Sequence, residues 1–371
     1  MELRTRAAVA AVAILLSLGS VACSSTDGGT DGGSNSAQDA AALDQAKAEV
    51  DEYTANPALV VEPLSRVPDK GMKVASVTCT VSSCYPGQFT AAAEALGWES
   101  TEYTYDLAQG PSAFVAAVRQ ALQAKPESLA ILFVYPIDVI ADEIEQAKAD
   151  GVVLVDVASA LDAPPEGFIS CVYCNTALAA YGKLMGTVAA VDAEGNSEFG
   201  VVGDKTLDAN RISGGATVEE LQRVSPNAEV HEINVGYSKT PQENAQTVIA
   251  ALQRNPKIEY LVFQSPDLMA GIKQALGAAG MADKIKVVSV GPTSPDMLME
   301  IESGFPNTWV GSEGESIAWS AVNQIARHSV GDPVDAVAPT TNRVITVDNA
   351  EPEMYVPLNY REAFTSAWGV A

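Results

Sequence analysis

The stretch LAILFVYPIDVIADEIEQAKADGVVLVDV, residues 129–157, decides the fold class of this chain. A continuous apolar run stands at each end, Leu129–Val134 and Val152–Val157. Between them, Pro136 begins a segment with apolar residues at helical spacing, and Gly151 ends it. Strands that are apolar on both faces are typical of a parallel sheet with helices on each side. The stretch therefore predicts a strand–helix–strand unit of an α/β protein.

The same alternation extends in both directions from this unit. Upstream, Lys73–Thr78 and Thr101–Tyr105 have the composition of strands, and Pro111–Ala124 has the spacing of a helix. Downstream the pattern starts again, with strands expected at Phe168–Val172, Glu198–Val202, Glu229–Asn234, Tyr260–Gln264, Lys286–Val290, Thr308–Gly311 and Val344–Val347. The 371 residues exceed one compact domain of ordinary size. We therefore predict an α/β fold of two doubly wound parallel-sheet lobes, with a ligand cleft between them at the strands' carboxyl ends.

The N-terminal segment has the features of a secretory signal. Two arginines precede an apolar run, Ala7–Leu18, and small residues follow it up to Ala22. The next residue is Cys23, and the junction resembles a bacterial lipobox, in which the cysteine is acylated before the signal is removed. We expect residues 1–22 to be removed and the lipid on Cys23 to anchor the protein at the extracytoplasmic face of the cell membrane. Ser20 departs from the aliphatic residue usual at that position, so an ordinary secretory signal is the alternative.

The segments that flank the two lobes have distinct compositions. Residues 23–42 are rich in Gly, Ser, Asp and Thr without a hydrophobic period, which predicts a flexible linker. Residues 43–71 begin with a short helix and lead into the first strand. The C-terminal extension, residues 350–371, carries Phe364 and Trp368 at helical spacing. We expect this extension to pack on the surface of one lobe.

Four further cysteines stand in two close pairs along the chain, Cys79 with Cys84 and Cys171 with Cys174. Export places them in an oxidising compartment, where an even number favours disulfides. Pairing within each close pair is the first choice among the three possible patterns. A C-x-x-C redox site at Cys171–Cys174 and a four-thiolate zinc site remain as alternatives.

Composition also limits the function. Acidic residues outnumber basic ones by 47 to 22, and such a surface repels nucleic-acid phosphates. The only histidines, His231 and His328, are expected on structural elements, which disfavours a Ser-His-Asp hydrolase. Nucleotide-binding glycine loops are absent from the sequence. We therefore expect a binding protein rather than an enzyme, with no cofactor, no metal and no nucleic-acid partner.

Several segments, in order, resemble one family over about residues 72–347. They are FTAAAEALGW from Phe89, FVYPIDVIADEIEQAKADGVVLVDVAS from Phe133, NTALAAYGKLMG from Asn175, FQSPDLMAGIKQAL from Phe263 and VVSVGPTSPDM from Val287. These segments resemble the ribose-binding-like, type I periplasmic binding proteins of sugar ABC transporters. The resemblance implies a monomer whose lobes close on one small polar solute by a hinge motion and then present it to a transporter permease.

The resemblance also implies how the chain is divided. It places the first lobe at residues 72–174 plus part of 294–345, and the second at residues 175–292, with exchanges between the lobes at the hinge. Crossings between lobes are expected near Cys174–Asn175, Pro292–Thr293 and Val344–Val347. A lipoprotein that feeds a sensor instead of a transporter would share this organisation and remains an alternative.

Carried over residue by residue, the family pattern implies a ligand site. Asp156 corresponds to a carboxylate that accepts sugar hydroxyls, Arg211 to a second-lobe guanidinium, and Tyr237 to a stacking aromatic residue. The full candidate set is Ser82, Tyr85, Phe89, Asp156, Arg211, Tyr237, Ser265, Asp267, Ser312 and Glu313. Structural alternatives are a capping role for Asp156 and an ion pair of Arg211 with Asp204 or Asp208.

Some acceptors of the family pattern are replaced here, which weakens the expectation of a simple pentose or hexose. Ser265-Pro266, Gly291-Pro292 and Ser312 stand where amide or carboxylate side chains are usual. A sugar, a polyol or another small polar solute is expected. If Asp156, Glu313 and Glu315 all face the cleft, an amine-bearing solute becomes the alternative.

Overall fold

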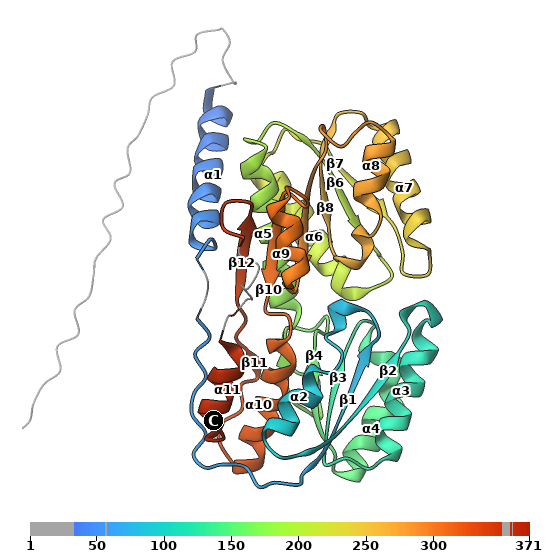
Figure 1. Ribbon diagram of the computed structural model, residues 1–371, viewed down its shortest axis with the longest axis vertical. Helices are drawn as coiled ribbons and strands as arrows, with labels where there is room; N and C mark the ends of the chain where they lie inside the picture. The colour runs from blue at the N-terminus through green and yellow to red at the C-terminus, as the bar shows by residue number, and fades with distance from the viewer. Residues whose placement is uncertain (1–32, 56–57, 351–356, 358) are drawn as a thin grey trace, which may run out of the picture.

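The computed structural model describes residues 33–55, 58–350, 357 and 359–371. In this part of the chain, two lobes lie one above the other, each built on a six-stranded sheet (Figure 1). The strand orders are β11-β5-β4-β3-β1-β2 and β12-β10-β9-β8-β6-β7. Neighbouring strands run parallel, apart from β12, which is antiparallel to β10. The predicted two-lobe α/β fold is confirmed.

Each sheet is assembled largely from consecutive strands. The first contains β1 (Lys73–Cys79), β2 (Glu99–Tyr105), β3 (Ser128–Leu132), β4 (Val153–Val157), β5 (Phe168–Val172) and β11 (Val337–Ala338). The second contains β6 (Glu198–Gly203), β7 (Val230–Asn234), β8 (Ile258–Phe263), β9 (Lys286–Gly291), β10 (Thr308–Ser312) and β12 (Asn342–Thr346). The central strands are buried on both faces, as their continuous apolar sequences predicted; Leu129 and Val155, for example, are fully buried.

Helices cover both sheets. The first lobe carries α2 (Gln88–Ala95), α3 (Pro111–Gln123), α4 (Ala141–Asp150), α10 (Ser316–Val330) and α11 (Tyr360–Trp368). The second carries α5 (Asn175–Asp192), α6 (Asp208–Val224), α7 (Pro241–Arg254), α8 (Ile272–Ala278) and α9 (Pro295–Glu302). Short 3-10 helices are η1 (Ser82–Cys84), η2 (Leu107–Gln109), η3 (Ile137–Ile140) and η4 (Asp267–Met269).

Local sequence explains where several helices begin and end. Proline occupies the first turn of α3, α7 and α9, where a missing N–H costs nothing. Thr240 and Glu243 form a reciprocal capping box at the start of α7. Gly151 ends α4 with a φ of 72°, a left-handed conformation that glycine adopts without steric penalty.

Between β1 and β12, the chain passes from one lobe to the other at three places. The first crossing is at Cys174, between β5 and α5, where the sequence predicted it. The second follows β10 and the third lies between β11 and β12. The crossings expected at Pro292–Thr293 and Val344–Val347 are therefore misplaced. The second lobe continues past residue 292 because β10 pairs with β9, and it also takes β12 as its edge strand.

Both ends of the described chain pack on the lobes. Helix α1 (Gly33–Glu52) lies against α5 and α6, with Ala46 fully buried and Lys183 paired with Glu49 at 2.7 Å. The predicted linker is therefore helical from Gly33 onward, whereas Cys23 lies outside the described residues. None of the helices that the structure describes combines the length and apolarity needed to cross a membrane.

The C-terminal extension packs on the first lobe, as predicted. Trp368 of α11 is 1% exposed and stacks on Trp319 of α10, with ring centroids 5.5 Å apart. Its indole N–H donates to Asn323 at 3.0 Å. Helix α11 is thus part of the folded lobe.

Candidate functional site

A cavity of about 100 Å³, partly open to solvent, lies between the lobes. The carboxyl ends of β3, β4 and β5 reach it from the first lobe, and those of β8, β9 and β10 from the second. Parallel sheets characteristically place ligand sites at these strand ends, because loops diverge there and leave a crevice. The location is therefore the one that the strand pattern predicted.

The cavity wall is mainly apolar and aromatic. Its aromatic residues are Tyr85, Phe133, Tyr173, Tyr181 and Tyr237, and its larger aliphatic residues are Leu107, Leu132, Val134, Val157, Leu178, Leu207, Val290 and Ile317. Ser83, Asn210, Gln264, Ser265 and Ser312 supply polar side chains. No charged side chain is among the described residues that line the cavity.

Three residues of the wall have a strained backbone. Tyr85, Ala158 and Tyr173 have φ angles of 55°, 64° and 61°, in the left-handed region that non-glycine residues rarely adopt. Each such residue costs of order 1–3 kcal/mol and persists only where its surroundings enforce it. Backbone strain in the described structure is therefore concentrated at this cavity.

Two disulfides lie beside these strained tyrosines. Cys79 is bonded to Cys84, the residue before Tyr85, with Cα atoms 5.4 Å apart. Cys171 is bonded to Cys174, with Tyr173 between them and Cα atoms 6.0 Å apart. The bonds follow the local pairing that the spacing favoured. Each closes a short loop and thereby restricts the backbone that presents a tyrosine to the cavity.

A chain of hydrogen bonds joins the two lobes across the cleft. Ser83 of the first lobe donates to Oδ2 of Asp267 at 2.7 Å, and Ser265 donates to the same oxygen at 3.4 Å. The hydroxyls of Ser265 and Tyr237 lie 2.5 Å apart. A further contact joins the N–H of Asp208 to the carbonyl of Val134 at 3.4 Å. The structure therefore describes a closed cleft.

The tyrosine hydroxyls in this cleft are neutral. Burial raises the pKa of Tyr85, Tyr173 and Tyr237 well above the ordinary value, and nearby acidic side chains add to the effect. Contacts with serine hydroxyls offset only part of the burial. These side chains can therefore donate a hydrogen bond and offer an aromatic face, but they carry no charge.

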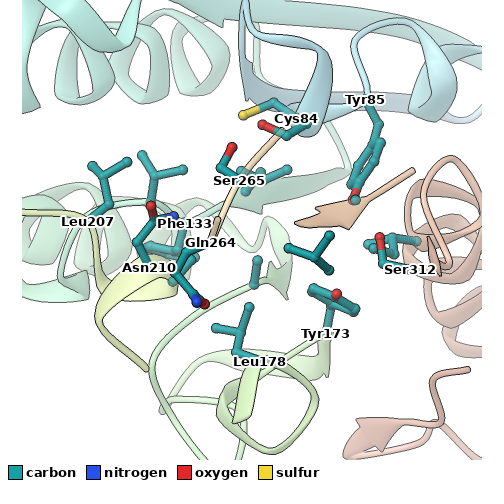
Figure 2. A pocket seen from close by; sticks show the side chains of 18 of the residues that line it. Cys84, Tyr85, Phe133, Tyr173, Leu178, Leu207, Asn210, Gln264, Ser265 and Ser312 are labelled. Atoms are coloured by element: carbon teal, nitrogen blue, oxygen red, sulfur yellow. The ribbon is translucent and has the colours of Figure 1, made fainter. Parts of the chain in front are cut away.

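The candidate residues from the sequence fall into two groups. Tyr85, Tyr237, Ser265 and Ser312 line the cavity, and Tyr85 and Ser312 are visible in Figure 2. Phe89 instead lines an adjoining smaller hollow in the first lobe. Asp267 is not among the lining residues, but it accepts hydrogen bonds from the lining residues Ser83 and Ser265. Ser82 begins η1, but its side chain lies outside the described part of the structure.

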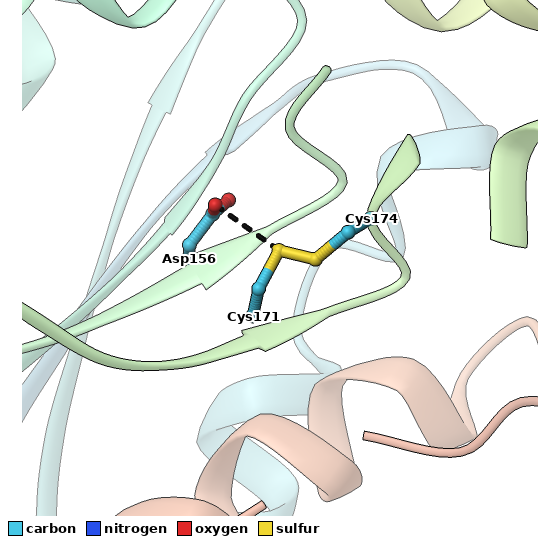
Figure 3. A group of neighbouring side chains, drawn as sticks. All are labelled: Asp156, Cys171 and Cys174. Atoms are coloured by element: carbon cyan, nitrogen blue, oxygen red, sulfur yellow. Dashed lines mark hydrogen bonds between the residues drawn. A yellow bond between two sulfur atoms is a disulfide. The ribbon is translucent and has the colours of Figure 1, made fainter. Parts of the chain in front are cut away.

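Asp156 does not line the cavity. It is fully buried in β4, whereas its neighbours Val157 and Ala158 reach the cavity wall. Its Oδ2 accepts from the Ser159 hydroxyl at 2.5 Å and lies 3.1 Å from the sulfur of Cys171, the contact dashed in Figure 3. A disulfide sulfur has no proton to donate, so that contact does not satisfy the carboxylate.

The environment of Asp156 favours its neutral form. Burial raises the pKa of this carboxyl from 3.8 to about 7, and hydrogen bonds from Ser159 offset only part of the effect. Its Oδ1 is buried without a hydrogen-bond partner among the described residues. Asp156 therefore supports the wall from behind, and the hydroxyl-binding role implied by the resemblance does not fit its position.

The expected cationic and acidic contacts are also absent from the described wall. Arg211 is largely exposed and pairs with Asp208 at 2.6 Å, the structural alternative considered above. Glu313 is not among the lining residues; it accepts from the backbone N–H of Thr341 at 2.6 Å and lies close enough to Tyr85 and Tyr173 to help raise the pKa of both. Glu315 pairs with Arg361 at 3.1 Å on the first lobe. The three carboxylates that suggested an amine-bearing solute therefore do not meet in the cleft.

Several wall residues were not singled out from the sequence. Asn210 is the neighbour of Arg211 on α6, so an error of one position in the helical phase separates the two. Tyr173 stands inside the CVYC loop, where the cysteines dominated the interpretation. Gln264 follows the end of β8, and Tyr181 follows the crossing at Cys174. The only signal for these segments was the rule that ligand sites lie at the carboxyl ends of parallel strands.

The arrangement of the cysteines disfavours both alternative functions for them. The sulfurs of Cys171 and Cys174 lie near Asp156, within 4.8 Å of one another, but they are joined in a disulfide and both residues are fully buried. Cys79 and Cys84 are bonded to each other elsewhere. A four-thiolate zinc site would need all four together, and thiol exchange needs an accessible sulfur.

Comparisons with known proteins identify the architecture. A family model described as a periplasmic binding protein domain matches residues 87–333. No curated protein sequence matches the chain.

Solved structures match over most of the chain. A 5-methylthioribose transporter solute-binding protein from Thermotoga lettingae is 18% identical over 82% of this chain and 95% of its own, with a TM-score of 0.66. A solute-binding protein from Agrobacterium vitis, bound to α-D-tagatopyranose, is 16% identical over 75% of this chain and 95% of its own, with a TM-score of 0.65. A ribose ABC transporter protein from Conexibacter woesei is 20% identical over 76% and 95%, with a TM-score of 0.63. At these identities the likeness establishes the fold.

The buried carboxyl of Asp156 predicts a specific pH dependence. Its raised pKa means that the folded state holds the proton more tightly than the unfolded state, so this residue's contribution to stability falls as pH rises from about 4 to about 7. Asp156→Asn removes the charge and keeps an acceptor for Ser159. Urea unfolding should show the variant gaining stability relative to wild type between pH 5 and pH 8. A stability difference that is flat or shrinks over this range would contradict the assignment.

Proposed function

The chain belongs to the periplasmic binding protein family, and on this premise we propose that it captures a sugar-like solute outside the cytoplasm and delivers it to an ABC transporter. The observation that carries the proposal is the cavity between two lobes that hydrogen-bond across its mouth, Ser83 to Asp267. Groups from both lobes surround the enclosed space. A solute held there would be bound by both lobes at once and would stabilise the closed form.

The neighbouring structures support a sugar-like solute. The Agrobacterium vitis protein is described with tagatopyranose, and the Thermotoga lettingae protein with 5-methylthioribose. Delivery to a permease follows from the same comparison. A sensor in place of a transporter would use the same capture step.

An enzymatic role has less support. The oxidoreductase alternative depends on Cys171 and Cys174, and both are fully buried behind the cavity wall. Neither histidine lines the cavity within the described residues. Binding without chemistry therefore accounts better for the site.

The retained solute provides the direct test of this function. Native mass spectrometry of the protein purified from its own host should show an adduct of a few hundred daltons that denaturation releases. A closed cleft slows solute escape, so the adduct is expected to survive purification. If the protein carries no adduct and a broad panel of sugars and polyols fails to raise its melting temperature, the proposal is contradicted.

The cross-cleft hydrogen bond predicts the effect of one substitution. Asp267→Ala removes the acceptor for Ser83 and Ser265, and a hydrogen bond to a charged group contributes about 1.5–3 kcal/mol. Solute affinity should fall roughly tenfold or more, since 1.4 kcal/mol corresponds to a factor of ten. Small-angle X-ray scattering should show a larger radius of gyration for the variant without solute. The matched control is Asp283→Ala, an exposed carboxylate on the same lobe; equal effects of both variants would refute the role given to Asp267.

The lipid anchor is part of the proposal and rests on the sequence around Cys23. In the native host, Cys23→Ser should move the protein from the membrane fraction to the soluble extracytoplasmic fraction and remove the mass of the lipid from its N-terminus. The solute affinity should stay unchanged, because the residues that line the cavity come from positions 83–317 of the two lobes. Retention of the variant in the membrane fraction would rule out this anchor.

A further inference from the structure

We infer, on the basis of the proposed function, that the solute is neutral and carries an apolar group about the size of a ring or a short alkyl chain beside its hydroxyls. The residues that carry this inference are the tyrosines and aliphatic side chains of the cavity and its two second-lobe amides, Asn210 and Gln264. A bare, fully hydroxylated sugar would leave much of this wall without a matching partner.

The absence of charge from the described wall argues for a neutral solute. A buried charge needs an opposite charge or several hydrogen bonds, because desolvation otherwise costs several kcal/mol. The carboxylate of Asp267 is near the cavity, but it already accepts from Ser83 and Ser265. Asp156 lies behind the wall, and Arg211 is paired with Asp208 outside it. An ionised solute would therefore find no counter-charge on the wall.

Several polar atoms of the wall are already engaged within the protein. The Tyr237 and Ser265 hydroxyls are paired at 2.5 Å. Oδ1 of Asn210 accepts from the Asp204 N–H at 3.1 Å, and Nε2 of Gln264 donates to Thr217 at 3.2 Å. A free sugar brings four or five hydroxyls, and each one buried without a partner costs about 1–3 kcal/mol. The hydroxyls of Tyr173 and Tyr181 and Nδ2 of Asn210 can still donate to a solute, but carboxylate acceptors for its hydroxyls are absent from the described wall.

One group is conspicuously available. Oε1 of Gln264 is buried and has no hydrogen-bond partner among the described residues. Gln264 and Asn210 lie together, across the cavity from Tyr85 and Ser312 (Figure 2). Both also approach Gly203: a Cβ there would lie 3.2 Å from Cγ of Gln264 and 3.5 Å from Oδ1 of Asn210. Gln264 and Asn210 therefore form a small polar patch in the cavity, which suits one or two hydroxyl or amide groups of a solute.

The remainder of the wall suits an apolar group. Tyr173 and Tyr181 stack with ring centroids 5.7 Å apart, and Leu178 lies near Tyr173 in Figure 2. Tyr85 enters from the opposite side, on the loop held by the Cys79–Cys84 disulfide. Aromatic and aliphatic surfaces gain about 25 cal/mol for each Å² of apolar area removed from water. A solute with an apolar group would gain more of this free energy than a bare sugar, because it buries more apolar area.

Matched pairs of neutral probes test the inference. Isothermal titration calorimetry on the purified full-length mature protein would compare D-ribose with 5-methylthioribose and D-glucose with phenyl β-D-glucoside. In at least one pair, the substituted member should bind at least about tenfold more tightly, because it buries additional apolar surface. Ribose 5-phosphate and glucosamine are the charged members of the panel and should not bind detectably.

Two variants of one wall residue separate the ring from its hydroxyl. Tyr85→Phe keeps the aromatic face and should retain the affinity for the substituted probe within about twofold, whereas Tyr85→Ser should lose about tenfold or more. Tyr85 is only partly buried on a loop, and melting temperatures would verify that both variants fold. An equal loss in both variants would show that the hydroxyl is the binding group and would overturn the inference.

The outcomes separate this inference from the proposed function. If the parent sugars bind as tightly as their substituted partners, or if only a charged probe binds, the solute class is wrong and the capture function stands. If neither member of any pair binds while another neutral polyol does, the inference is again overturned and capture stands. If no probe of any class binds, both the inference and the proposed function are contradicted.

Discussion

The hydrogen bond from Ser83 to Asp267 is the interaction on which the site depends. Ser83 belongs to a first-lobe loop and Asp267 to a second-lobe turn, so their contact brings together two wall halves that the chain builds separately. With this contact formed, Tyr85 and Tyr237 face one enclosed space. Without it, each lobe would present a shallow apolar surface to water. Closure thus creates the cavity, and a solute bound there would supply free energy that favours closure.

The two disulfides give this closure a rigid first-lobe partner. Both close short loops, and each loop places a tyrosine with a left-handed backbone at the cavity. A loop free to relax would leave that conformation and withdraw its ring. The buried carboxyl of Asp156, whose pKa is raised to about 7, lies beside the second of these loops, 3.1 Å from the sulfur of Cys171. The left-handed backbone of Tyr173, the Cys171–Cys174 disulfide and the buried carboxyl of Asp156 therefore all lie at one part of the cavity wall.

The sequence predicted the fold well because buried parallel strands have continuous apolar sequences. The strands at Leu129–Val134 and Val152–Val157 can be predicted from their own sequences, without knowing which strands they pair with. The second crossing was misplaced because β10 remains with the second sheet through its pairing with β9, a long-range contact that no local pattern encodes. Helix α1 extends to Gly33 because it packs on α5 and α6, which its own composition did not predict.

The site was predicted in part. Tyr85, Tyr237, Ser265 and Ser312 are at strand ends that the parallel sheet brings together. The charged candidates, Asp156 and Arg211, were chosen for the chemistry of a hydroxyl-binding site, but the direction of a strand residue and the phase of a helix decide what reaches a cavity. Neutral residues next to them, Ala158 and Asn210, occupy the wall instead. Because neither residue is charged, nothing in the sequence was a reason to select them as ligand contacts. The same lack of charge makes the described cavity wall neutral.

A crystal structure of the protein as purified from its own host would test the central claim most directly. The account predicts closed lobes and electron density for one neutral molecule between Tyr85, Tyr173 and Tyr237, with a polar group within hydrogen-bond distance of Gln264. Closed lobes around a cavity that holds only water, or a solute bound through Arg211 or Glu313 outside this cavity, would contradict it.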